Sequence, residues 1–199
     1  MIKAYAVTLF LIAANVACFV LELVRGGSED GQTLLMLGAA YAPYIMEGEL
    51  YRLLCSMFLH FGITHLGNNM IALWALGSYL EPKVGHIRLF VIYLLGGLAG
   101  NLASFAWEVF TGDFAVSVGA SGGVFALFGC VLSLFLFRRE YVRELSLVRM
   151  LLALGFLVAG SFEADINVAA HIGGLAGGWL AGTVCLASLP VIVVEEKHP

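Results

Sequence analysis

Residues Val118 to Phe137 read VGASGGVFALFGCVLSLFLF and include no charged residue. A helix needs about 20 apolar residues to cross the hydrocarbon core of a bilayer, so this segment is long enough to span a membrane. One hydroxyl group, that of Ser121, stands among glycines near its beginning. Ser121 is either a nucleophile or a small residue that lets two membrane helices touch. The rest of the chain bears on that choice.

Composition places the whole chain in a membrane. Hydrophobic residues make up 61% of the sequence and charged residues 12%, whereas an ordinary soluble domain has about 25% charged residues. The mean hydropathy is +0.95. The formal net charge is -4 and there is no basic tract, which argues against nucleic acid as a partner. The four cysteines show no metal-binding spacing and are expected to be small core residues.

Apolar runs between charged residues predict an all-α membrane protein of six transmembrane helices. We expect residues 1–199 to form a single membrane domain. The first run is too long for the apolar part of a signal peptide and is interpreted as a retained span. The spans are expected near residues 4–24, 62–80, 87–107, 118–137, 147–162 and 168–190.

The long connection from Arg25 to Phe61 mixes acids and glycines with apolar stretches such as LLMLGAAYAPYI. It is therefore not a simple solvated loop, and we expect it to lie in the membrane interface.

Lysines and arginines in short loops stay in the cytoplasm, so their positions predict orientation. All except Arg25 and Arg52 lie at the chain ends or in the second and fourth connections, and acids dominate the other connections. Both termini are therefore expected to be cytoplasmic. The residues assigned to the cytoplasmic side are Lys3, Lys83, Arg88, Arg138, Arg139, Arg143, Arg149 and Lys197.

This topology brings three polar residues to similar depth. The second, fourth and sixth spans run inward from the outer face, and they begin with His65, Ser121 and His171. Ionisable groups in a membrane persist mainly where they face a water-filled cavity or one another. The joint placement therefore favours a catalytic site.

A serine hydroxyl becomes a nucleophile when a base accepts its proton, and His171 can be that base for Ser121. No Asp or Glu lies on a helix near His171; Asp165 is in the preceding loop. The sequence thus predicts a Ser–His dyad and no conventional triad.

His65 and Asn69 are four residues apart and share one helix face. Both can donate a hydrogen bond to the oxyanion formed when Ser121 attacks a carbonyl. Asn68 is rotated by about 100° from Asn69 and is expected to face elsewhere.

Glycines provide the close helix contact that the dyad needs. Gly174, Gly178 and Gly182 form a stripe below His171, and Gly122, Ala126 and Gly129 form another below Ser121. Such stripes let two backbones approach closely. Phe125 lies one turn below Ser121, where its ring can pack against His171.

Each motif also has a structural interpretation. A glycine-flanked serine in a membrane helix is more often a packing surface than a nucleophile. The G-x-S-x-G match is uninformative because that elbow needs a preceding strand. His60, nearer the loop, is assigned mainly to a structural role.

Three segments in this order, HFGITHLGNNMIALWALGSYLE, GASGGVFALFG and AHIGGLAGG, resemble the signatures of rhomboid intramembrane serine proteases. The resemblance covers about the last three-quarters of the chain. It implies a six-helix rhomboid-like bundle in which Ser121 is the nucleophile, His171 the general base, and His65 and Asn69 the oxyanion donors. It also implies that the fifth helix, near residues 149–162, acts as a lateral gate and that the loop of residues 163–170 is a cap. The connection from Arg25 to Phe61 would be a half-submerged first loop.

Two positions depart from the family pattern. Tyr51-Arg52 stands in place of the usual Trp-Arg, and Phe125 stands where many members have tyrosine. Neither change removes a catalytic group, although the missing hydroxyl at Phe125 can loosen the hydrogen bonding around His171.

The favoured function is cleavage of transmembrane substrates near the extracytoplasmic face, without cofactor or metal, in a prokaryotic inner membrane. One alternative is an inactive relative that binds membrane clients, although this chain keeps Ser121 and His171. Another is a small transporter, whose polar residues would line a pathway across the membrane midplane. The polar groups of this chain instead gather near one face. A zinc protease is disfavoured because no HExxH motif is present, although His60, His65 and His171 could in principle bind zinc.

Overall fold

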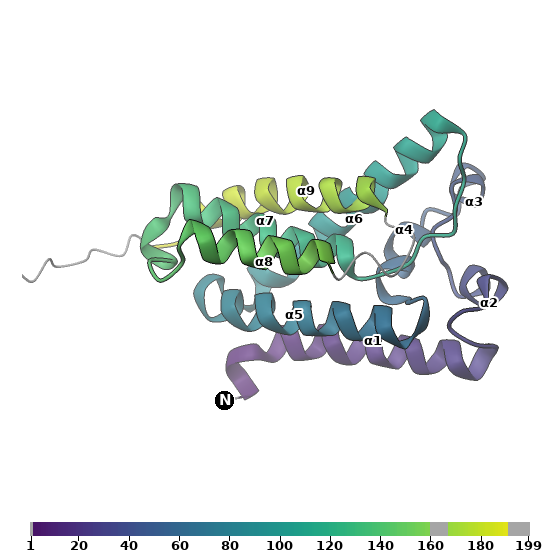
Figure 1. Cartoon of the computed structure of the whole chain (residues 1–199), viewed down its shortest axis with the longest axis horizontal. Coiled ribbons are helices and arrows are strands. Elements are labelled where there is room, and N and C mark those ends of the chain that lie inside the picture. The colour runs from purple at the N-terminus through teal and green to yellow at the C-terminus, as the bar shows by residue number, and fades with distance from the viewer. Residues whose placement is uncertain (1, 160–166, 191–199) are drawn as a thin grey trace, which may run out of the picture.

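The computed structural model describes residues 2–159 and 167–190, and within these ranges the chain is helical, without a β-strand (Figure 1). One isolated β-bridge joins Ala40 to Ser117. The long helices are α1 (Ala6–Arg25), α5 (Gly62–Val84), α6 (His86–Thr111), α7 (Ser121–Phe137), α8 (Leu147–Ala159) and α9 (Val168–Leu186). The short ones are η1 (Ile2–Tyr5), α2 (Gly31–Met36), α3 (Ala42–Met46), α4 (Arg52–Cys55), η2 (Ser56–Phe58) and η3 (Arg139–Tyr141).

Three helices, α1, α6 and α9, are long and apolar enough to cross a membrane, and α7 and α8 are shorter apolar helices. The six long helices fall on the six predicted segments. The prediction of six spans with cytoplasmic termini stays a prediction, as does that of a single domain. Residues 160–162 of the fifth predicted span lie outside the described residues.

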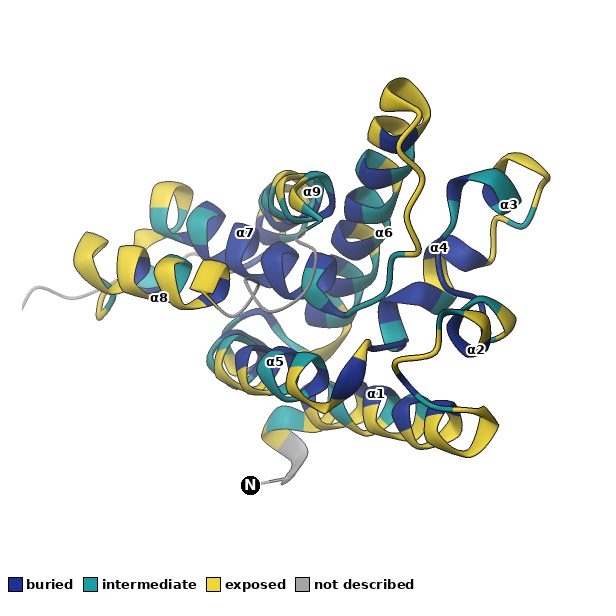
Figure 2. Ribbon diagram, turned by 45° about the vertical axis from the view of Figure 1, so that its right-hand side comes forward, coloured by how far each residue is buried: buried dark blue, intermediate teal, exposed yellow. Residues whose placement is uncertain are grey.

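Helix α7 packs against α5, α6 and α9, and α6 and α9 also pack directly against each other. Most residues of α7 are buried (Figure 2). A Cβ atom on Gly174 would overlap the backbone of Gly122, and one on Gly178 would overlap that of Ala126. The predicted close contact of the two stripes is therefore confirmed. Helix α6 also takes part, since Gly96 lies against Ala126 and Gly178.

Helix α5 extends to Val84, past the predicted end near residue 80. The charged stretch at its end is stabilised by α1. Buried Glu81 accepts hydrogen bonds from Val7 N–H (2.7 Å), Thr8 N–H (2.8 Å) and the Thr8 hydroxyl (2.5 Å). These bonds offset the cost of burying a carboxylate and join α1 to α5.

The connection between α1 and α5 folds into short helices (Figure 1), and two small apolar clusters pack it against the rest of the bundle. Buried Arg52 stabilises it, donating to the carbonyl oxygens of Leu35 (2.8 Å) and Ala39 (3.0 Å) and to Glu49 (2.6 Å). Hydrogen bonds from Tyr51 and Arg52 hold the pKa of Glu49 below its usual value.

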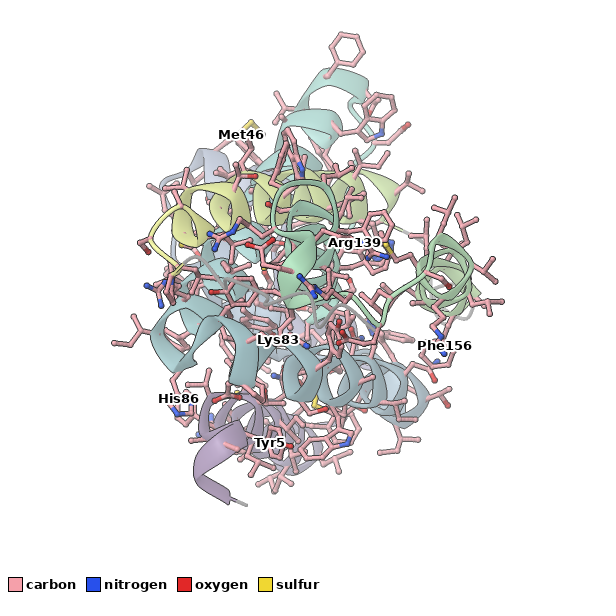
Figure 3. All side chains as sticks on the ribbon, turned by 90° about the vertical axis from the view of Figure 1, so that its left-hand side faces the viewer. Tyr5, Met46, Lys83, His86, Arg139 and Phe156 are labelled. Carbon is pink, nitrogen blue, oxygen red and sulfur yellow. The ribbon has the colours of Figure 1, made fainter. Side chains whose placement is uncertain are left out.

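Helix α8 stands apart from the other long helices. Of its described residues only Met150 and Leu157 are buried. Figure 3 shows Phe156 on this helix at the side of the bundle, and its ring is about half-exposed. Helix α8 therefore has few interactions to keep it in one position.

Candidate active site

Ser121 is the first residue of α7, and the chain enters it through a tight turn. Gly119 has φ +134°, which an L side chain rarely adopts, and a Cβ there would lie 2.8 Å from the His65 ring. Gly119 N–H donates to the Ser56 carbonyl (2.9 Å), and Ala120 N–H donates to His60 Nε2 (3.4 Å). The residues before Ser121 are thus fixed by the preceding loop.

His171 lies in the first turn of α9, and its Nε2 is 3.0 Å from Ser121 Oγ, within hydrogen-bond distance. The Phe125 ring stacks on the imidazole, with centroids 4.3 Å apart and planes inclined by 12°. The predicted packing of Phe125 against His171 is therefore confirmed. With no hydroxyl on Phe125, this ring restrains His171 by contact alone.

His65 and Asn69, on the first turns of α5, line the same cavity as Ser121 and His171. Asn69 donates one amide hydrogen to the His65 carbonyl (3.0 Å). His65 Nδ1 accepts a long hydrogen bond from Phe61 N–H (3.4 Å). Asn68 also borders this cavity, and the expectation that its side chain faces away from that of Asn69 stays a prediction.

His60 has a structural contact, as expected of it. Its ring is fully buried and packs edge-to-face on His65, with centroids 5.2 Å apart. Its backbone N–H donates to Glu22 Oε1 (3.0 Å), and Glu22 is also fully buried. His60 thereby connects α1 to the turn before Ser121.

The cavity has a volume of about 740 Å³ and is bounded by α2, α5, α6, α7, α8 and α9 together with the segment before α7. Phe156 and Leu157 of α8 form part of its wall. Glu29 is the one carboxylate among its described lining residues. The described part of the site therefore holds a serine and a histidine without an acid beside them.

Glu22 and Asn101 are among the polar residues of this region that the sequence analysis missed. Glu22 is an acid inside an apolar run, which is itself a signal of a specific partner. Asn101 lines the cavity and donates to the Leu53 carbonyl (2.6 Å) and to the Ser56 hydroxyl (2.9 Å). Both residues hold the loop between α1 and α5 against the bundle.

Some predictions fall on residues that the structure does not describe. Residues 163–166, half of the expected cap and including Asp165, lie outside the described residues. Asn167 to Ala170, the remainder of that segment, form the beginning of α9 and the residue before it. Among the described residues no cluster of three potential metal ligands occurs.

Comparison with known proteins gives a consistent result. A family model described as "Rhomboid domain" matches residues 47–188. Rhomboid protease GluP of Bacillus subtilis is 36% identical over 87% of this chain, and the match covers 34% of GluP. YdcA of the same organism, provisionally named a rhomboid protease, is 33% identical over 93% of this chain and 91% of its own length. RHOMBOID-like protein 5 of Arabidopsis thaliana is 34% identical over 83% of this chain and 54% of its own. The chain thus spans about a third of GluP and nearly all of YdcA.

Proposed function

The chain belongs to the rhomboid family and is an integral membrane protein, and on this premise we propose that it is an intramembrane serine endopeptidase. The observation that carries the proposal is the 3.0 Å contact between Ser121 Oγ and His171 Nε2. Family membership alone does not distinguish a protease from an inactive relative. A serine and a histidine within hydrogen-bond distance in a cavity support the protease.

In the proposed reaction, Ser121 Oγ attacks the scissile carbonyl carbon while its proton passes to His171 Nε2. The tetrahedral intermediate then collapses, the C–N bond breaks, and His171 gives the proton to the leaving amine. This leaves an acyl-enzyme ester on Ser121. Water, deprotonated by His171, attacks the ester, and the carboxylic acid product leaves as Ser121 regains its proton.

The oxyanion of the intermediate needs hydrogen-bond donors that are already in position. We assign this role to His65, Asn69 and the backbone N–H of Ser121. Asn69 uses one amide hydrogen for the His65 carbonyl, which orients the group and leaves the second hydrogen for the substrate. The stacked Phe125 ring restrains His171, so the base keeps its direction toward Ser121 through both steps.

The proposed substrates are transmembrane segments of other membrane proteins. A segment in a bilayer can approach the cavity only from the side, and α8 is the wall held by the fewest buried contacts. We therefore assign α8 the role of the gate. The distribution of lysines and arginines supports our assignment of the site to the extracytoplasmic side of a cell membrane.

Purified protein in detergent, given a transmembrane substrate and a fluorophosphonate probe, tests the proposal. Wild-type protein is expected to cleave the substrate and be labelled, while Ser121→Ala does neither and unfolds at nearly the same temperature, because Ala keeps the small volume. His171→Ala is also expected to lose labelling. An unlabelled wild type that still binds membrane proteins would indicate the client-binding function instead.

A further inference from the structure

Asn167 occupies the N-cap of α9, four residues before His171. Its Oδ1 accepts a hydrogen bond from Ala170 N–H (2.9 Å), and its backbone carbonyl accepts one from His171 N–H (3.1 Å). N-capping residues with such bonds fix where a helix begins. The backbone position of His171 therefore depends directly on Asn167.

The amide nitrogen of Asn167 makes two further bonds outside α9. It donates to the Ser117 hydroxyl (2.9 Å) and to the Ser104 hydroxyl on α6 (2.5 Å). An Asn side chain has two N–H donors, so both are used. The Ser104 hydroxyl in turn donates to Glu108 (3.0 Å). One side chain thus fixes α9 to two other segments.

Ser117 stands four residues before Ser121, as Asn167 stands four residues before His171. Its backbone is held firmly, since Ser117 N–H donates to the Ala40 carbonyl (2.9 Å) and its own carbonyl accepts from Ala40 N–H (3.0 Å). The bond between Asn167 and Ser117 therefore joins the chain just before the serine to the chain just before the histidine.

A second polar bond joins the same two helices at the other end. Ser133 on α7 and Thr183 on α9 lie 2.9 Å apart, each twelve residues after Ser121 or His171. At 1.5 Å per residue this bond is about 18 Å from the dyad. Between the two bonds lie the glycine contacts of α7 and α9. Of these two bonds, the Asn167–Ser117 bond is the one close enough to control the geometry of the dyad.

We propose that Asn167, through Ser117, is a positioning residue that sets the distance and direction between Ser121 and His171; the proposal rests on the proposed function. Glycine contacts fix how closely α7 and α9 approach but allow sliding and rotation, because they contain no directional bond. The hydrogen bond from the Asn167 amide to Ser117 is directional, and it fixes the orientation of the two helices at their N-terminal ends. A displacement of the dyad by about 1 Å is enough to reduce rate on the order of 100-fold.

Matched variants separate this role from a general loss of stability. Asn167→Ser keeps an oxygen that caps α9 but is too short to reach Ser117 or Ser104, so it removes both outer bonds. Ser117→Ala removes the Asn167–Ser117 bond from the other side, whereas Ser117→Thr keeps a hydroxyl that can accept it. Ser133→Ala is the control, because it removes a hydroxyl bond between the same helices far from the dyad.

The measurement is the second-order rate of fluorophosphonate labelling of the full chain in detergent, together with kcat and KM on a transmembrane substrate. Asn167→Ser and Ser117→Ala are each expected to slow labelling on the order of tenfold and to lower kcat with KM unchanged. The double variant is expected to be no slower than the slower single variant, because both single changes already remove the Asn167–Ser117 bond. Ser117→Thr and Ser133→Ala are expected to stay within about twofold of wild type.

Ser117 and Asn167 also line the cavity, so a direct contact with substrate must be distinguished. The small probe does this because it has no peptide chain. Unchanged labelling with a raised KM would overturn the proposal, as would equal slowing by Ser133→Ala or additive effects in the double variant. A wild type that is not labelled and does not cleave would overturn the proposed function, and this inference with it.

Discussion

At the scale of single residues, the site is held by side chains that act on backbone groups. His60 receives the Ala120 N–H, Asn69 donates to the His65 carbonyl, and Asn167 caps the helix of His171. In a membrane no bulk water forms hydrogen bonds with these groups. Leaving one of them without a partner therefore costs several kcal/mol of folding free energy. Precision at Ser121 therefore depends on neighbours that need not touch the substrate.

Asn69→Ala is expected to lower kcat on the order of 100-fold while changing KM little. An oxyanion donor acts mainly on charge that develops in the transition state. Steady-state kinetics on a transmembrane substrate provide the measurement, with Asn68→Ala as the matched control from the same cavity. A change in KM alone would make Asn69 a substrate-binding residue.

The types of residue in the site were predictable from the sequence, and part of their arrangement was not. Ser121, His171, His65 and Asn69 stand out because polar groups in apolar helices are rare. Asn167 carries the ordinary signal of an N-cap, an Asn before an apolar run. Its bonds to Ser104 and Ser117 depend on how three distant segments meet, and no local pattern encodes that.

At the scale of helices, burial of charge explains where the boundaries differ from expectation. Charged residues near the end of α5 suggested an end near residue 80, yet Glu81 is paired with α1 and the helix continues. Conversely, α7 begins at Ser121 and not at Val118, because Gly119 adopts a positive φ that interrupts the helix. Both differences come from tertiary contacts that override a hydropathy boundary.

Gly174→Ala is expected to destabilise the protein by about 1–3 kcal/mol, because its methyl group would overlap the backbone of Gly122. Activity should fall too, because the added methyl group pushes α7 and α9 apart and so moves Ser121 away from His171. Gly155→Ala on α8 is the matched control: nothing lies within 4 Å of its Cβ, so it should stabilise by about 0.5 kcal/mol through helix propensity. Thermal unfolding in detergent measures both. An equal fall for the two variants would disprove the packing argument.

The connection before α8 is fixed by Glu144, which accepts hydrogen bonds from Lys83 (2.8 Å) and Tyr79 (2.8 Å). The Lys83 bond is the main cause that lowers the pKa of Glu144 to about 2 from 4.5. Because the folded pKa is the lower one, this stabilisation is complete above pH 4.5 and is lost as the pH falls toward 2. Glu144 is half-exposed, so the effect is modest.

Glu144→Gln is accordingly expected to lower the Tm slightly at pH 6, and the difference from wild type should disappear between pH 4.5 and 2. Thermal unfolding at several pH values measures it. A Tm difference that persists unchanged at pH 2 would show that the carboxylate charge is not its source.

At the scale of the whole molecule, the dyad lies at one end of the bundle. Ser121 is the first residue of α7 and His171 is in the first turn of α9. At 1.5 Å per residue, both lie on the order of 10 Å or less from that end of their helices. A transmembrane substrate must bring its scissile bond to this depth, and a bond inside an intact helix is shielded, so the substrate must unwind locally.

Cleavage is therefore expected in the outer third of the substrate span or just outside it, favoured by nearby glycine or proline, which weaken a helix. A small residue is expected before the cut, as the family resemblance implies. Mass spectrometry of the products locates the bond. A dominant cut at the bilayer centre or on the cytoplasmic side would contradict the inferred orientation or the catalytic assignment.

The contrast between the tightly joined α6, α7 and α9 and the loosely held α8 has a consequence for amide hydrogen exchange. Backbone hydrogens in the three packed helices can exchange only when the core opens globally, whereas those of α8 exchange through small local openings. The two classes should therefore differ in protection although all four helices are apolar. The cavity wall formed by α8 can then open many times before the core around Ser121 and His171 unfolds once. Substrate entry therefore depends on the free energy of local opening of α8, and the geometry of the dyad depends on the free energy of global unfolding.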